Sequence, residues 1–443
     1  MKNVNTRRIA YDIFKEIMSD NKYSNLAIKQ RLTKETNKQD RAFITKLVYG
    51  TLEHLITIDY IISLYAKKSV KPAVKDILRL GVYQIYYLNV PDSAACNESV
   101  RLAKELGKDG ITSFINAILR NVSRDKENLA FPNKKDLVKY LSVLYSYPEH
   151  IVKLLIKDYG QDTAEKIMAF EANNSFSIRA NVNKITTEEL NKKLTENGFE
   201  LKTSSLTKEA LIAYDSDIIS SEFYKDGLIS IQSESSMLAA QTVVSALSNI
   251  KNPNVLDACA APGGKTFYIK EHVKDSKLVC WDIHEHRVKL INAGASRLGL
   301  LDIKTETQDA TILKEEYIDF FDAVLIDAPC SGLGVIASKP DIKYSSSEAD
   351  LKEIIILQRK ILKTCAKYVK NGGTLIYSTC TILKDENEHM VNEFLENNKS
   401  FKKIPISEFI DIDNKHIVNG YAQMLNINTG HEGFFIAGMV KNT

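Results

Sequence analysis

The sequence predicts a multidomain protein with an all-α bundle at its N-terminus, a small α+β module in the middle, and a C-terminal α/β domain built on a mostly parallel, seven-stranded sheet. Two patterns support this prediction. Apolar residues recur at helical spacing over residues 1–125, whereas short apolar runs alternate with helical stretches from residue 254 onward. A chain of 443 residues is long enough for two or three domains. We therefore expect domains at 1–125, 126–235 and 236–443.

The first 125 residues are expected to form six or seven helices in a compact bundle. Ile9, Ile13 and Ile17 lie on one face of the first helix because they recur every four residues. The later helical stretches begin near Asp40, Pro72, Ser93 or Asn97, and Ile111.

Charge is distributed unevenly along the chain. Residues 1–125 hold 21 Lys and Arg against 13 Asp and Glu, a net charge of +8, whereas the rest of the chain carries −5. A basic helical part indicates an anionic partner such as RNA, although a solvated helical surface would show the same charge. No apolar run approaches 18 residues, the first eight residues lack a signal core, and six cysteines are too few for a disulfide framework in this length. We expect a cytoplasmic protein without a membrane span.

The middle of the chain carries weaker signals. Residues 126–135 contain the Asn and Pro of a linker, an amphipathic helix follows Tyr147, and residues 177–183 alternate like a strand. A helix over 187–197 and weak strand patterns complete the α+β module. A helix that begins near Met237 then leads into the first strand of the α/β domain.

The strands of the C-terminal sheet are short apolar runs. The last two form a hairpin over 421–440, with its turn at Thr429 and Gly430. The five strands before the hairpin are predicted at 254–258, 277–282, 303–307, 322–327 and 373–379.

A glycine-rich turn follows the first strand, at residues 257–266, and opens into a helix. A phosphate-binding P-loop is excluded because Cys259 occupies the position that this motif gives to Gly, and a dinucleotide fingerprint would need a third Gly. A Rossmann-like turn for a nucleoside remains, beside the simpler reading of a turn without a ligand. Asp282 ends the next strand, 18 residues after Gly264, where a carboxylate accepts hydrogen bonds from ribose hydroxyls. S-adenosylmethionine suits this pair of features.

Two cysteines follow neighbouring strands of the predicted sheet. Cys330 comes shortly after Asp327 at the end of the fourth strand, and Cys380 follows the fifth. Carbon 5 of a pyrimidine is a poor nucleophile, but a thiolate that adds to carbon 6 makes the ring enamine-like and able to attack a methyl group. A carboxyl group beside ring nitrogen 3 would stabilise the developing charge, and a base must later remove the proton from carbon 5. Zinc ligation by the two thiols is the alternative, although neither a C-x-x-C pair nor a nearby His supports it. Cys96, Cys280 and Cys365 are expected to be buried core residues.

The helical part resembles the NusB-type RNA-binding domain. The resemblance rests on residues 40–51, 78–84 and 114–120. It implies a helical bundle that contacts RNA through basic residues, for which the candidates are Arg7, Arg8, Arg120 and Arg124.

The C-terminal part resembles the RsmB/NOP family of RNA cytosine-5 methyltransferases, which are class I enzymes with a Rossmann-like domain. The motifs that carry the resemblance are residues 257–266, 327–332, 340–343, 378–380 and 433–435. The resemblance implies that Cys380 is the nucleophile, that Cys330 assists product release and that Asp327 contacts the target base. It also implies a cofactor site for S-adenosylmethionine lined by Cys259, Ala260, Ala261, Pro262, Gly263, Gly264, Lys265, Asp282, Asp309 and Asp327.

The two resemblances together imply a monomeric, metal-free enzyme that methylates carbon 5 of one specific cytosine in 16S rRNA, either free or in an early assembly particle. A tRNA-directed enzyme would carry the same catalytic motifs. A non-catalytic RNA-binding assembly factor would have no need of Asp327, Cys330 and Cys380 together, and a small-molecule methyltransferase would have no need of a basic helical domain.

Overall fold

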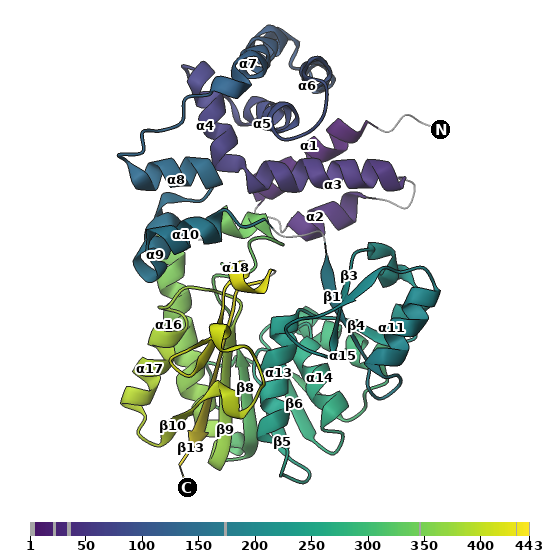
Figure 1. Cartoon of the computed structure of the whole chain (residues 1–443), viewed down its shortest axis with the longest axis vertical. Coiled ribbons are helices and arrows are strands. Elements are labelled where there is room, and N and C mark those ends of the chain that lie inside the picture. Colours follow the sequence, from purple (N-terminus) through teal and green to yellow (C-terminus); the bar gives the residue numbers. More distant parts are fainter. Residues whose placement is uncertain are drawn as a thin grey trace. The chain divides into compact units, whose positions relative to one another are not determined.

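The computed structural model describes residues 5–20, 24–32, 37–171, 175–344, 347–430 and 432–442. The chain divides into two compact units: a helical unit of residues 1–169 with 338–347, and a mixed unit of residues 170–337 with 348–443. Figure 1 shows both units, with elements numbered along the chain. The first four residues, part of the N-terminus that we expect to lack a signal core, lie outside the described ranges.

The helical unit begins with seven α-helices in the region where six or seven are predicted. Asn37 caps α3 by accepting a hydrogen bond from the Asp40 N–H, and Pro72 occupies the first turn of α5, where its missing N–H costs nothing. No single described helix has the length and hydropathy of a membrane span; α3 and α4 meet that test only as a pair, across a 76° bend. The seven helices are α1 (Thr6–Asp20), α2 (Ser24–Arg31), α3 (Lys38–Glu53), α4 (Leu55–Tyr65), α5 (Pro72–Tyr86), α6 (Asp92–Glu105) and α7 (Thr112–Asp125).

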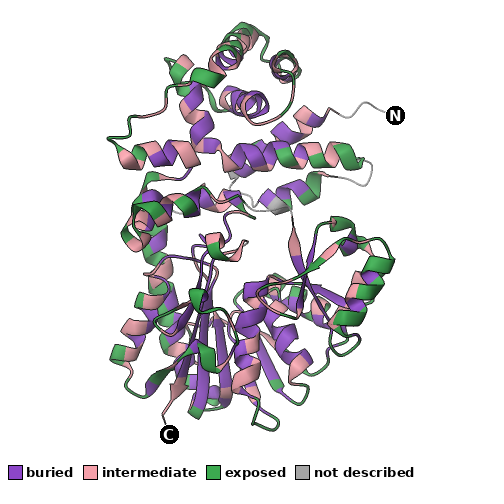
Figure 2. Cartoon of the chain, in the orientation of Figure 1, coloured by how far each residue is buried: buried purple, intermediate pink, exposed green. Residues whose placement is uncertain are grey.

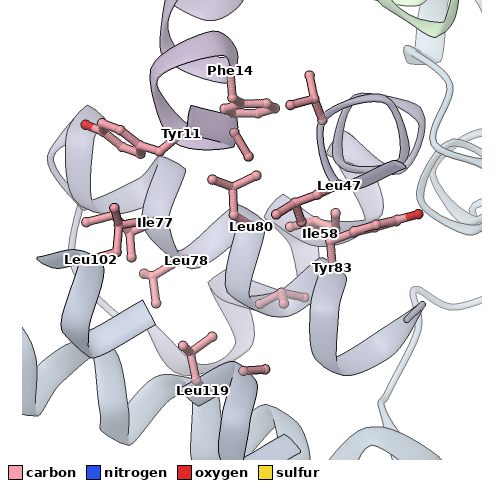
Figure 3. Packing of buried hydrophobic residues seen from close by; sticks show 14 of the residues in the cluster. Tyr11, Phe14, Leu47, Ile58, Ile77, Leu78, Leu80, Tyr83, Leu102 and Leu119 are labelled. Carbon is pink, nitrogen blue, oxygen red and sulfur yellow. The ribbon is translucent and has the colours of Figure 1, made fainter. Parts of the chain in front are cut away.

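The core of this unit is apolar and closely packed. Phe14, Leu47 and Leu80 come from three different helices and are almost completely buried together (Figure 3). Burying each such side chain contributes about 1.5–3 kcal/mol. Gly81 allows α5 to approach α7, because a Cβ there would lie 2.9 Å from the Leu119 side chain.

Three further helices extend the helical unit beyond residue 125. They are α8 (Leu137–Tyr145), α9 (Glu149–Tyr159) and α10 (Gln161–Met168). The Thr57 hydroxyl of α4 donates to the carbonyl of Val143 in α8. The contacts therefore divide the chain after residue 169, within the segment 126–235 that the sequence analysis assigns to a linker and module.

A short segment from the second half of the chain also belongs to the helical unit. Asp341 accepts a hydrogen bond from the Ser24 hydroxyl at 2.8 Å. Lys343 is 4% exposed, with its Nζ 3.3 Å from the Glu53 carbonyl oxygen and 4.1 Å from the Tyr147 ring centre. Burial lowers the pKa of Lys343 to about 8. Asp341 and Lys343 thus anchor residues 338–344 among helices that lie far away in the sequence.

The α+β module forms the first part of the mixed unit. Its antiparallel sheet has the order β2-β3-β1-β4, and its longer helix is α11 (Thr187–Glu196) with a capping box at Thr186 and Glu189. The strands are β1 (Phe176–Ala180), β2 (Leu201–Thr203), β3 (Ala210–Ala213) and β4 (Ile229–Ile231), with the short helix α12 (Glu222–Lys225) before β4.

The C-terminal sheet has nine strands in the order β11-β12-β13-β9-β8-β5-β6-β7, with β10 paired to β13. The strands β5 to β9 are parallel. β12 and β13 pair in antiparallel register as the predicted hairpin, and β13 joins this hairpin to β9, also in antiparallel register. Seven strands match the predicted ones; the two-residue β11 and the four-residue β10 add to the antiparallel edge. The strands are β5 (Asn254–Asp257), β6 (Lys277–Asp282), β7 (Ile303–Thr307), β8 (Phe321–Asp327), β9 (Val369–Thr379), β10 (Phe401–Ile404), β11 (Ile417–Val418), β12 (Tyr421–Met424) and β13 (Phe434–Lys441).

Helices cover both faces of this sheet, and alternate strand residues supply two separate cores. Val255 and Leu278 pack with residues of α13, α14 and α15, whereas Leu256 and Val279 pack with residues of α16 and α17. Figure 2 shows the resulting buried strands between partly exposed helices. The helices are α13 (Glu234–Ala246), α14 (Gly264–His272), α15 (Glu285–Leu298), α16 (Glu348–Cys365), α17 (Glu388–Asn397) and α18 (Asn426–Thr429).

A buried ion pair joins the module to the sheet domain. Arg179 of β1 is 1% exposed and pairs with the carboxylate of Glu271 in α14, which is also 1% exposed. The Arg179 Nε also donates to the Gln232 side chain at 2.7 Å. Because both charges are buried, removing one of them would leave the other without a partner and would strongly destabilise the fold.

Replacing Arg179 by Met should therefore lower the free energy of unfolding by about 3–5 kcal/mol, because Glu271 would stay buried without its partner. The double variant Arg179→Met/Glu271→Met should recover most of the loss. Urea denaturation followed by circular dichroism measures both. The control is Arg359→Met, since Arg359 pairs with Glu393 at an exposed site and its loss should cost at most about 1 kcal/mol. Equal losses in Arg179→Met and Arg359→Met would contradict this account.

Candidate active site

The glycine-rich turn lies at the carboxyl end of β5, as predicted. Gly263 has φ +108°, and a Cβ at this position would lie 2.3 Å from the Phe267 ring, so only Gly fits. The Ala260 N–H donates to the Trp281 carbonyl at 2.8 Å, which fastens the turn to β6. Thr266 donates to Asp257 at 2.7 Å, and burial raises the pKa of Asp257 to about 7. These contacts hold the turn in place, and α14 begins directly after it, at Gly264.

Asp282 and Asp309 follow the neighbouring strands β6 and β7. Asp282 is 4% exposed; it accepts a hydrogen bond from the His284 N–H at 3.0 Å and lies 3.3 Å from the Arg287 guanidinium. Asp309 accepts hydrogen bonds from the N–H and hydroxyl of Thr311 at 2.8 and 2.7 Å. Because β5, β6, β7 and β8 are adjacent and parallel, the turn and these carboxylates lie along one edge of the sheet.

Asp327 at the end of β8 is held by two donors. The Lys265 Nζ lies 2.7 Å from one carboxylate oxygen, and the Ser378 hydroxyl donates to the other at 2.9 Å. Burial is the largest single influence and acts to lower the pKa of Lys265. The charge and hydrogen bond of Asp327, together with the charges of Asp257 and Cys380, outweigh burial, so this pKa is raised and the ammonium persists. Lys265, predicted to line the cofactor site, thus also orients the carboxyl group that is predicted to face the base.

The two predicted thiols meet at the ends of β8 and β9. The Sγ atoms of Cys330 and Cys380 are 3.3 Å apart although 50 residues separate them. The Gly334 N–H donates to the Cys380 carbonyl at 3.0 Å, which ties the loop after Cys330 to β9. Contact with Cys380, followed by burial, raises the pKa of the Cys330 thiol well above its usual range. One thiol of the pair therefore stays protonated when the other ionises.

The remaining cysteines lie apart from this pair. Cys96, Cys280 and Cys365 are buried, as expected for core residues, and Cys259 is half-buried in the glycine-rich turn, where burial raises its pKa. Within the described ranges, no group of three or more His, Cys, Asp and Glu side chains is arranged to hold a metal ion.

Sequence reasoning missed the polar residues that surround the thiol loops. Ser378 holds Asp327, and the buried Glu386 and Asn387 bind residues next to both cysteines. Glu386 and Asn387 follow Cys380 closely in the chain, but an acid within the polar run 384–388 gives no sign that it is buried. Only the folded structure shows that these residues lie beside the cysteines.

The four arginines proposed for RNA contact differ in their surroundings. Arg7 lies 4.6 Å from the Phe43 ring centre and donates to Gln84, so it is engaged inside the helical unit. Arg8 pairs with Asp12 and Arg124 with Asp125, whereas Arg120 is exposed on α7. Arg120 and Arg124 are therefore the two exposed candidates.

Comparison with protein-family models gives three matches that together span most of the chain. The model described as 16S rRNA methyltransferase RsmB/F matches residues 244–440. The NusB family model matches residues 4–124, and the ferredoxin-like domain of RsmF/B-like methyltransferases matches residues 147–215.

Full-length relatives and solved structures agree with these models. The probable ribosomal RNA small subunit methyltransferase B of Bacillus subtilis is 38% identical over 457 aligned residues, which cover 100% of both chains. The Synechocystis protein of the same description is 31% identical and covers 99% of this chain and 100% of its own. The crystal structure of PH0851 superposes with a TM-score of 0.81 at 25% identity, over 99% of this chain and 98% of that one. NSun6 from Pyrococcus horikoshii, solved with SFG, shares the fold with a TM-score of 0.60 at 21% identity, over 68% of this chain and 100% of that one.

The fold and these matches define the class of the protein: a methyltransferase with an N-terminal NusB domain and a ferredoxin-like module. Within that class, the chain belongs to the RsmB/F family of 16S rRNA methyltransferases.

The short distance between the thiols has a direct chemical consequence. Diamide should convert Cys330 and Cys380 of the purified protein into a disulfide, because their sulfur atoms are 3.3 Å apart. Peptide mapping by mass spectrometry without reduction measures the product. Cys330→Ser and Cys380→Ser should each abolish it, while Cys365→Ser should leave it intact, since Cys365 is buried elsewhere. If diamide forms no disulfide between Cys330 and Cys380 in the wild-type protein, the described geometry is wrong.

Proposed function

We propose that this protein transfers a methyl group from S-adenosylmethionine to carbon 5 of a cytosine in 16S rRNA through a covalent bond between Cys380 and the base. The observation that carries the proposal is the pair of thiols 3.3 Å apart, one of which directly follows β9 while the other lies in the loop after Asp327. A methyltransferase that acts on a nitrogen atom has no use for two thiols, because nitrogen already carries a lone pair.

The residues at the carboxyl ends of β5 to β8 suit S-adenosylmethionine. A glycine-rich turn after the first strand is the usual place for a nucleoside in such a sheet, and the carboxylate of Asp282 would accept hydrogen bonds from ribose hydroxyls. Asp309 and Asp327 add carboxylate oxygens for amino groups, and a ligand with a positive sulfonium suits an edge with three carboxylates. S-adenosylmethionine supplies the electrophilic methyl group when bound. The structural relative NSun6 was solved with SFG, an analogue of this compound.

Asp327 and Lys265 would act on the base before methyl transfer. As Cys380 adds to carbon 6, negative charge moves onto ring nitrogen 3 and its neighbouring oxygen. The Asp327 carboxyl group is held by Lys265 at 2.7 Å, so this pair can place a proton or a hydrogen bond at nitrogen 3. Carbon 5 then attacks the methyl group, and any proton placed on nitrogen 3 returns to the Asp327–Lys265 pair, so that nitrogen 3 ends neutral.

Cys330 would complete the reaction as the base that removes the proton from carbon 5. In the free protein, contact with Cys380 is the first cause of its raised pKa, ahead of burial. Once Cys380 is bonded to carbon, it is a neutral thioether and no longer opposes the ionisation of Cys330. Cys330 then loses its proton to solvent, and its thiolate takes the proton from carbon 5. The ring regains aromaticity as the Cys380 sulfur leaves with its electron pair. The addition of Cys380 to the cytosine thus makes it easier for Cys330 to ionise and act as the general base.

The helical unit would supply the RNA-binding surface. Residues 1–125 carry a net charge of +8, and this region matches the NusB family model. RNA targets are read most easily in unpaired segments, from which the base can be splayed into the site. A 16S rRNA target is favoured because the relatives that match over the full length are described as small subunit rRNA methyltransferases.

Covalent trapping tests the proposal. Cys330→Ala should form a protein–RNA adduct that persists on denaturing gels, because its product cannot be released, and Cys380→Ala should form none. Bisulfite sequencing should locate 5-methylcytosine in wild-type reactions, and Cys380→Ala should lower the rate by about a thousandfold or more. Full-rate methylation by Cys380→Ala would overturn the assigned nucleophile.

The substrate class is tested in the same reactions. Unmethylated 16S rRNA, an early small-subunit particle and total tRNA serve as parallel substrates. Methylation confined to tRNA would replace the 16S rRNA assignment while retaining the chemistry. Cys96→Ala, at a buried cysteine of the helical unit, is the matched control and should react like the wild type.

Replacing Asp282 by Asn should weaken the binding of sinefungin, a stable analogue of S-adenosylmethionine, about 10- to 100-fold. The carboxylate is expected to accept hydrogen bonds from the ribose, and charge-assisted hydrogen bonds contribute about 1.5–3 kcal/mol. Isothermal titration calorimetry without RNA measures the affinity. Asp322→Asn is the control, because Asp322 lies at the opposite end of β8. Unchanged affinity in Asp282→Asn would exclude Asp282 from the ribose site.

A further inference from the structure

A buried carboxylate lies between the loops that carry the two thiols. Glu386 is 0% exposed and accepts four hydrogen bonds, all from neutral donors. Two come from Ser331, the residue after Cys330, through its N–H at 2.9 Å and its hydroxyl. A third comes from the hydroxyl of Thr381, the residue after Cys380, at 3.1 Å. One side chain therefore binds the immediate neighbours of both cysteines.

The fourth donor extends the network to the start of the Cys330 loop. The Gln358 amide nitrogen lies 2.9 Å from Glu386 and also 2.9 Å from the Pro329 carbonyl oxygen. The Ser331 and Thr381 hydroxyls are 2.7 Å apart, so the two loops also contact each other directly. Pro329 and Ser331 flank Cys330 on both sides, which leaves its backbone little freedom.

The next residue in the chain holds the other loop in the same way. The Asn387 side chain accepts a hydrogen bond from the Thr379 hydroxyl and donates to the Thr381 carbonyl at 2.9 Å. Thr379 and Thr381 flank Cys380. Both cysteines are thus fixed by their neighbours, and each is only half-buried.

The cost of burying this carboxylate indicates that it has a role. An isolated ion in the interior is strongly disfavoured, and within the described ranges no Lys, Arg or His forms an ion pair with Glu386. Burial raises the pKa of Glu386, and the hydrogen bonds from Ser331, Gln358 and Thr381 oppose that effect. A neutral, apolar side chain would fill the space at lower cost but could not bind two loops at once.

We infer that Glu386 is a positioning residue that sets the distance between Cys330 and Cys380. It touches neither thiol and acts through Ser331 and Thr381. The inference rests on the proposed function for its catalytic meaning, since the thiol spacing matters to methylation only if both cysteines take part.

The test uses disulfide formation as a gauge of the thiol spacing, without RNA or cofactor. Glu386→Gln keeps the shape of the side chain but replaces one acceptor oxygen by a donor. At Oε2 this donor opposes both the Ser331 N–H and the Gln358 amide, and at Oε1 it forces the Ser331 and Thr381 hydroxyls to reverse their hydrogen bonds. Formation of the Cys330–Cys380 disulfide by diamide should slow at least tenfold. The methylation kcat should fall at least tenfold as well, while the KM for S-adenosylmethionine stays within twofold, because Glu386 does not contact the 259–265 turn.

The controls separate positioning from general damage. Glu396→Gln alters an exposed acid on α17 and should match the wild type in both assays. Ser331→Ala removes only the hydroxyl donor and should slow disulfide formation about threefold. This variant replaces Glu386→Gln in the test if circular dichroism shows that Glu386→Gln does not fold. Wild-type disulfide rates in both folded variants would overturn the inference. Methylation of RNA by Cys380→Ala would contradict the proposed function. That result would not change the disulfide rates of wild type and Glu386→Gln, so the two failures can be told apart.

Discussion

The pairing of β8 with β9 determines where every reactive group of the site lies. Neighbouring strands are about 4.8 Å apart, so residues that leave two adjacent parallel strands at the same level begin close together. Asp327 is paired with Ser378 in register, and the Ser378 hydroxyl donates to the Asp327 carboxylate. Cys330 and Cys380 follow within three residues, and their sulfur atoms meet at 3.3 Å. A slip of one residue in this register would separate the thiols and turn alternate side chains to the other face.

The site combines a half-buried carboxyl group, Asp327, and a fully buried one, Glu386, whose partners differ. Asp327 is paired with the Lys265 ammonium, so its charge is compensated where the substrate base is expected to bind. Within the described ranges, the hydrogen-bond donors to Glu386 are the neutral groups of Ser331, Gln358 and Thr381, which suit it to holding the two loops. Reactive and positioning carboxylates are thus distinguished by the kind of partner that satisfies them.

Much of this arrangement could be predicted from the sequence. Strands such as β6 and β8 are short buried apolar runs, and the carboxyl ends of adjacent parallel strands must meet, which is why Cys330 and Cys380 could be expected to lie together. The role of Glu386 could not be predicted, because burial of an acid depends on tertiary packing rather than on local pattern. The position of residues 338–344 among the helices could not be predicted either, since nothing in the local sequence shows that Lys343 is buried, yet it is 4% exposed. The short β10 and β11 depend on the edge strands that they join and carry no strong pattern of their own.

The central claim is that the Cys380 sulfur, and not the Cys330 sulfur, bonds to the base. RNA in which 5-fluorocytosine replaces cytosine tests it directly in the wild-type protein, because fluorine cannot leave carbon 5 as a cation and the reaction stops at the covalent stage. After nuclease and protease digestion, mass spectrometry identifies the modified peptide. The account predicts one methylated fluorocytidine on the peptide that contains Cys380 and an unmodified peptide that contains Cys330. A nucleotide on Cys330, or methyl transfer to normal RNA with no adduct from the fluorinated RNA, would contradict it.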